Sequence, residues 1–172
     1  FNRLAYVALS GGFGEVHLGR DFALAHLNTL SFDAFNNNGV AKANSLVYGI
    51  VGTGPLYTTQ LVSNTISYTL PKTLGGVYGG VMLGMGENPS GAANSKDGNY
   101  YAARLGYAQG PLDVAGAYSQ TKYVGTATLG DYTHANLGAS YDAGFAKFFA
   151  LYNRVEVDLA PGKVRKNTVE VG

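Results

Sequence analysis

Few residues of this chain have the spacing that enzymatic or metal chemistry needs. Residues 11–14 lack the Gly-Lys-Ser/Thr that completes a phosphate-binding loop, and a strand pattern follows them. Ser10 does not stand in a Gly-x-Ser-x-Gly elbow. Glu15 and Asp21 could pair as acid and base, a hypothesis that no other motif supports. The histidines are too scattered for zinc-ligand spacing: His17, His26 and His134. The sequence therefore predicts neither an enzyme nor a cofactor site.

Composition narrows the class of protein further. The chain has 172 residues, the size of one domain, and a net charge of +1, which gives no reason to expect nucleic acid as a partner. Charged residues make up only 13%, against about 25% in soluble proteins. There are 25 Gly and 13 Tyr but no Cys, so no disulfide framework is present. This balance favours a sheet with one face in lipid.

The connections between the expected strands alternate in length. Tight Gly-rich turns are expected at residues 11–14, 72–75, 109–111 and 142–144, and long polar loops at residues 21–63, 86–97, 123–130 and 156–166. Such alternation is typical of an up-and-down transmembrane β-barrel, which has short turns at one rim and long loops at the other.

Period-2 patterning places the strands and their faces. Leu105 and Tyr101 share one face while Arg104 lies on the other, and Leu137 alternates with Asn136. We expect strands at residues 2–10, 14–20, 64–71, 76–85, 98–109, 111–122, 131–141 and 144–156, with another beginning near 167. The fold class predicted is thus all-β, an antiparallel transmembrane barrel forming a single domain over residues 1–172.

Periodicity alone does not say which face is inside. A soluble sandwich or lipocalin-like barrel would have an apolar interior, whereas a membrane barrel puts its apolar face into lipid. The low charge favours the membrane alternative. The chain starts and stops within strand patterns, so we expect it to be part of a longer barrel, because open sheet edges do not survive in lipid.

The connection over residues 21–63 is far longer than ordinary structureless loops, which indicates a function. Folded into the lumen of a water-filled barrel, it would narrow the channel; the alternatives are a cover over the outer mouth or a contact between subunits. Selectivity would then come from charges facing one another across the gap. The wall candidates are Arg104 and Lys147, and the loop candidates are Asp21, Asp33 and Lys42, with His26 as a titratable neighbour.

Several segments resemble the general porins of Gram-negative outer membranes in their β-proteobacterial branch. The first hairpin, FNRLAYVALSGGFGEVHLGRD, is similar to the family pattern V-x-L-S-G-x-F-G-x-V-x-L-G-R. Asp33-Ala34-Phe35 resembles the Asp-Pro-Phe of the family's third loop, and the strand after it begins with a similar Asn-Thr-Ile-Ser-Tyr. Later hairpins match by their order, including residues 110–112 and 137–142.

The resemblance implies a barrel of about 16 strands, usually a homotrimer in outer-membrane lipid, that passes small hydrophilic solutes and ions by diffusion. It aligns Arg3 with an arginine that lines the constriction of anion-preferring members. Many relatives also carry an arginine shortly before the strand that leaves the third loop, where this chain has Leu61-Val62-Ser63. We therefore expect a weak anion preference or little preference.

The leading hypothesis is an outer-membrane general diffusion porin. The alternative is a non-porous outer-membrane barrel that acts as an adhesin or structural anchor, and an outer-membrane enzyme is a third, weaker hypothesis. A loop folded into the lumen distinguishes the first two, because an anchor has no need of a constriction.

Overall fold

The computed structural model describes residues 3–47, 60–123, 130–159 and 162–172. One antiparallel sheet runs in sequence order from β1 to β9. Its strands are β1 (Ala5–Gly11), β2 (Gly14–Phe22), β3 (Leu61–Thr69), β4 (Val77–Gly84), β5 (Tyr100–Gln109), β6 (Leu112–Thr121), β7 (Tyr132–Asp142), β8 (Lys147–Leu159) and β9 (Gly162–Val171). Two helices, α1 (Leu24–Phe32) and α2 (Ala43–Val47), lie between β2 and β3. The predicted up-and-down topology is confirmed.

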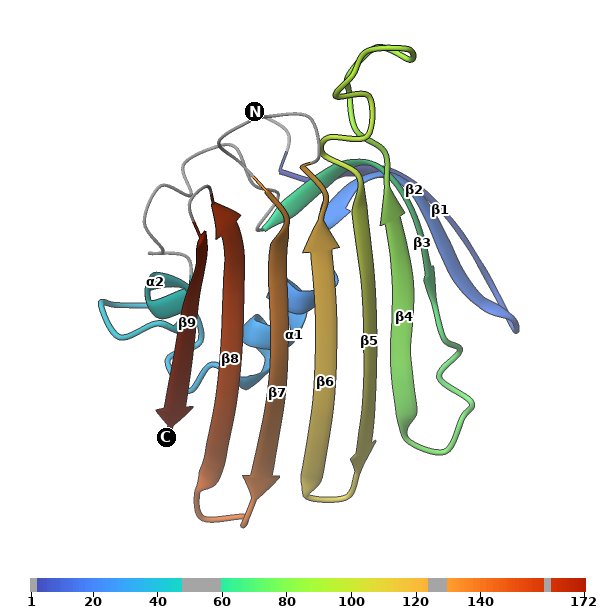
Figure 1. Cartoon of the computed structure of the whole chain (residues 1–172). Coiled ribbons are helices and arrows are strands. Elements are labelled where there is room, and N and C mark those ends of the chain that lie inside the picture. Colours follow the sequence, from blue (N-terminus) through green and yellow to red (C-terminus); the bar gives the residue numbers. More distant parts are fainter. Residues whose placement is uncertain (1–2, 48–59, 124–129, 160–161) are drawn as a thin grey trace.

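Tight turns and long connections lie at opposite ends of the sheet (Figure 1). The first turn closes with Gly11 opposite Gly14. Gly14 has a φ of 109°, and a Cβ there would come within 2.3 Å of the Thr69 carbonyl oxygen on β3, so only glycine fits. The prediction of a long loop over residues 156–166 is wrong. Most of residues 156–166 are strand, because outward-facing charges on β8 and β9 pair across the ladder and extend it.

The apolar face of the sheet is the exposed one. Leu105 is 62% exposed and Leu137 57%, whereas Asn136 and Ser119 on the opposite face are buried. A soluble barrel would show the reverse, so the predicted orientation of the two faces is confirmed.

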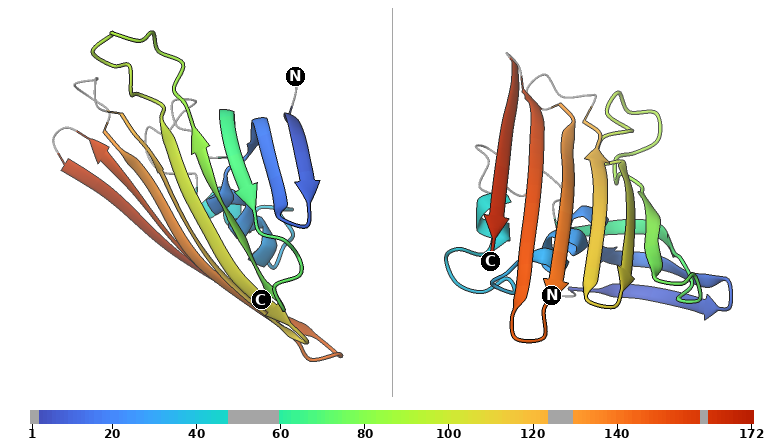
Figure 2. Two further views of the ribbon diagram at one scale, coloured as in Figure 1. Left: turned by 90° about the vertical axis from the view of Figure 1, so that its right-hand side faces the viewer. Right: turned by 90° about the horizontal axis from the view of Figure 1, so that it is seen from below.

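The sheet curves, and both helices lie on its concave side (Figures 1 and 2). The polar face of the strands is therefore covered in part by the segment between β2 and β3. None of the helices among the described residues is long and apolar enough to cross a bilayer.

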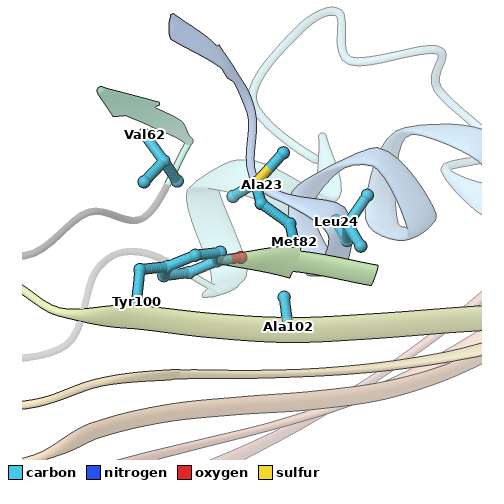
Figure 3. Packing of buried hydrophobic residues seen from close by; sticks show 6 residues of the cluster. All are labelled: Ala23, Leu24, Val62, Met82, Tyr100 and Ala102. Carbon is cyan, nitrogen blue, oxygen red and sulfur yellow. The ribbon is translucent and has the colours of Figure 1, made fainter. Parts of the chain in front are cut away.

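Three apolar clusters fix this segment to the wall. Figure 3 shows the first, where the helix start packs on β3 to β5: Ala23, Leu24, Val62, Met82, Tyr100 and Ala102. The second buries the end of α1 and the start of α2: Phe32, Ala43, Ala115 and Leu151. The third holds α2 against β7 and β8: Val47, Tyr132, Val155 and Val157.

These clusters show that the sheet does not divide simply into an apolar outer face and a polar inner face. Leu151 interrupts the polar side of its strand, and it is buried against Phe32 on the concave side. Inner-facing apolar residues therefore stand where the helices pack, since burial of their surface stabilises the docked segment.

Gly138 gives a test of this docking. A Cβ at Gly138 would lie 2.2 Å from the Phe32 ring, whereas one at Gly116 would meet nothing closer than 3.6 Å. Gly138→Ala should displace Phe32 at a cost of about 1–3 kcal/mol. We expect trypsin to cleave the folded full-length protein faster after Lys42 in G138A, with G116A cleaved at the wild-type rate. Equal rates in all three proteins would contradict this docking.

Candidate functional site

A buried polar network joins α1 to the inner wall. The Asn28 Nδ2 donates to the Asn136 Oδ1 at 2.8 Å and to the Ala115 carbonyl at 3.0 Å. The Asn136 Nδ2 donates in turn to the Thr29 Oγ1 at 3.0 Å. The Thr29 hydroxyl lies 3.2 Å from the Asn153 Oδ1. Since a buried polar group without a partner is costly, this network fixes the position of the helix against β6 to β8.

Arg104 stands at the junction of the wall and the helix. Its Nε donates to the Asn28 Oδ1 at 2.9 Å and its Nη2 to the Ser31 Oγ at 2.8 Å. The guanidinium lies 5.1 Å from the Tyr78 ring centroid, and the Tyr78 hydroxyl donates to Asp113 at 2.6 Å. Among the described residues no carboxylate forms an ion pair with Arg104. Its positive charge is therefore held by neutral partners beside the helix.

Arg3 and Asp21 lie near the start of the helical segment. The Arg3 guanidinium is 5.4 Å from the Phe22 ring centroid, and this arginine is exposed. Asp21 accepts from the Phe22 N–H at 2.7 Å and lies 2.6 Å from the His17 Nδ1. His17 also contacts Glu15. The inner face of β2 thus carries two carboxylates around one imidazole.

Asp33 shapes the segment between the helices. It is 4% exposed, and its carboxylate accepts from the N–H groups of Phe35 at 2.9 Å, Asn37 at 3.1 Å and Ala43 at 3.1 Å. A turn follows, with left-handed φ angles of 50° and 60° at Asn36 and Asn37. The Asp33 charge is therefore directed at backbone N–H groups, while Lys42 beyond this turn is half-buried.

Lys147 is separate from this group. It begins β8 opposite Asp142 at the tight-turn end, is exposed, and lies 5.2 Å from the Phe149 ring centroid. The structure thus brings Arg104 to the helix and Arg3 and Asp21 to its start, and leaves Lys147 at the rim.

His26 is the titratable group of α1. Its side chain is buried, 5.6 Å from the Phe22 ring by centroids. Burial, together with the nearby His134 and Arg3, lowers the pKa of His26 to about 4. The imidazole is therefore neutral at pH 7.

The amide network was not predicted from the sequence. A signal was available, since asparagine is disfavoured in strands and both Asn136 and Asn153 occupy mid-strand positions on the inner face. What it did not contain was the partner, because Asn28 lies more than 100 residues from Asn136 in the chain, at a separation of 108. Among the described residues no group of three His, Cys, Asp or Glu side chains could hold a metal ion.

Comparison with known proteins agrees with this architecture. Outer membrane porin protein 32 of Delftia acidovorans is 29% identical over 174 residues, which cover all of this chain and 49% of that protein. An anion-selective porin from Comamonas acidovorans superposes with a TM-score of 0.83 at 28% identity, covering 96% of this chain and 50% of the other. OmpT of Vibrio cholerae shares the fold, with a TM-score of 0.65 at 15% identity over 98% of this chain and 52% of its own.

The chain thus spans about half the length of the relatives it matches. The family model for Gram-negative porins matches residues 1–172. The chain therefore belongs to the Gram-negative porin family, which indicates an outer-membrane β-barrel.

Proposed function

We propose that the full-length protein is a general diffusion porin in which residues 21–63 fold into the lumen as the constriction; of this segment, residues 48–59 lie outside the described residues. Small hydrophilic solutes and ions would pass between this segment and the uncovered wall. The observation that carries the proposal is the hydrogen bonding of α1 to the concave faces of β5 to β8, through residues such as Asn28 and Arg104. A helix bound there occupies part of the space that the wall encloses.

We further propose that Arg104 and Arg3 give the constriction a weak anion preference. The hydrogen-bond partners of Arg104 are neutral, and the carboxylate of Asp113 reaches it only through Tyr78, while Glu15 and Asp21 gather around His17 on β2. Opposed groups of this kind would produce a field across the gap. The anion selectivity named for the Comamonas relative supports the sign. Val62 is buried in the first apolar cluster, so the segment leaving the loop adds no cation at that position.

A non-porous anchor or adhesin is the rival function. A non-porous anchor would have a closed interior. A closed interior disfavours an arginine that forms no ion pair with a carboxylate. Arg104 therefore favours a wet lumen.

Conductance tests the main proposal. The purified full-length protein in planar bilayers should give stepwise openings, and a homotrimer should close in three equal steps. The protein denatured before insertion is the control. Absence of steps from folded protein would contradict the porin proposal, and single or paired closures would contradict the trimer alone.

Arg104 tests the origin of selectivity. Arg104→Gln should lower the ratio of chloride to potassium permeability, measured from reversal potentials in a salt gradient, because the positive potential at the constriction is lost. Lys147→Gln removes the same charge at the rim and should change the ratio much less, since salt screens a charge more than a Debye length of about 10 Å away. Equal effects of the two variants would contradict the proposed site.

Protonation of His26 provides a test of how stably α1 is docked against the wall. Because its pKa is about 4 when docked and 6.5 when free, the undocked state binds more protons between these values. Docking is thus fully stable above about pH 6.5 and weakens by about 1.4 kcal/mol per pH unit as the pH falls. Amide exchange in α1, corrected for intrinsic rates, should accelerate from pH 7 to pH 5 in wild type and less so in His26→Gln. The same acceleration in both proteins would assign the effect elsewhere.

A further inference from the structure

One tyrosine side chain on the inner wall crosses from β4 to β6. Tyr78 on β4 is paired with Gly106 on β5, and Gly106 is paired in turn with Ala115 on β6. The Tyr78 hydroxyl nevertheless donates to the Asp113 Oδ1 on β6, at 2.6 Å. The tyrosine ring therefore lies across the intervening strand, on the side of the sheet that faces the lumen.

The absence of a side chain at Gly106 makes this crossing possible. A Cβ there would overlap the Tyr78 Cζ and would lie 2.7 Å from the Tyr78 hydroxyl oxygen. Gly106 does not have a left-handed φ, so its backbone does not require glycine. The Tyr78 ring fills the space and also packs against the apolar cluster that contains Phe32 and Ala115. The wall and the docked helix together thus fix the position of the ring.

The Tyr78 ring stands between two opposite charges. The Arg104 guanidinium carbon lies 5.1 Å from the ring centroid, which is within the range of a cation–π interaction. Arg104 is on the long-loop side of Gly106, whereas Asp113 is on the tight-turn side of Ala115. Since the ring contacts one charge and its hydroxyl is bonded to the other, the two charges lie within a Debye length, about 10 Å, of each other.

The two charges form no ion pair with each other, because each has the tyrosine as a neutral partner. Arg104 and Asp113 are absent from the ion pairs among the described residues. Without the phenol, the long arginine side chain and the carboxylate would face each other directly. A charge-assisted hydrogen bond between them would cancel much of the positive potential that Arg104 presents to the lumen.

We propose that Tyr78 is a specificity-determining residue of the channel, because its ring and hydroxyl keep the Asp113 carboxylate away from Arg104. The positive charge that favours anions is thereby preserved. Tyr78 carries no charge at neutral pH and acts through Arg104, so it is a positioning residue. The inference rests on the proposed contribution of Arg104 to selectivity and deepens it.

Reversal potentials of the full-length protein in a salt gradient test this role. Tyr78→Ala should lower the ratio of chloride to potassium permeability by about twofold or more, the effect of an exposed ion pair, although it changes no charge. Asp113→Asn removes the competing carboxylate. In Y78A/D113N the ratio should therefore return to that of D113N alone. Phe149→Ala, which removes an inner-facing ring near the tight-turn end, is the matched control and should keep the wild-type ratio.

Gly106→Ala provides a second route that retains the tyrosine and both charges. The added methyl group should displace the ring and lower the permeability ratio as Y78A does, and D113N should again restore it. Gly116→Ala on the neighbouring strand is the control, because a Cβ there would meet nothing closer than 3.6 Å. If Y78A forms no channels, G106A decides the test.

The inference is overturned if Y78A conducts with the wild-type permeability ratio. It is also overturned if D113N fails to restore the ratio in the Y78A channel, since the ring would then act only in packing the wall. An R104Q channel with the wild-type ratio would refute the proposed source of selectivity together with this inference. A changed ratio in R104Q without a change in Y78A would refute the inference alone.

Discussion

The hydrogen-bonded contact between α1 and the inner wall is the interaction on which the rest of the structure depends. Asn28 on the helix and Asn136 on β7 satisfy each other, and Thr29 lies between Asn136 and Asn153. Removing any one of them would leave a buried amide or hydroxyl unpaired, at a cost of about 1–3 kcal/mol. The network therefore specifies one docked position where apolar packing alone would permit several.

The apolar clusters stabilise the docked helices, whereas the hydrogen-bond network fixes their position on the wall. Phe32 is fully buried and occupies the space that a side chain at Gly138 would need. Leu151 and Met82, inner-facing residues that break the alternation of their strands, are covered by the same segment. The inner wall thus has two parts. One is polar, and the other is apolar and packs against the helices as side chains pack in a protein core.

The charges divide in the same way. Arg104 is bound by a helix amide and a hydroxyl and keeps its charge, whereas Asp33 gives its oxygens to backbone N–H groups of the segment. Charges on β8 and β9 face outward and pair with one another across the two strands, as in Lys163 with Asp158 and Arg165 with Glu156. Charged residues therefore have three different roles in this chain. The role of each depends on the strand face it occupies and on its immediate partners.

The sequence by itself determined the strands, their antiparallel order and the tight-turn rim, because period-2 patterning and Gly-rich turns are local signals. It also placed Arg104 on the inner face by parity, and the low charge pointed to lipid outside. Only the tertiary structure decided where residues 24–47 dock, that Asp33 is buried, and that residues 156–159 and 162–166 continue the ladder. Those outcomes depend on contacts between residues far apart in the chain, such as Asn28 with Asn136 and Phe32 with Gly138, and no local pattern encodes a distant partner.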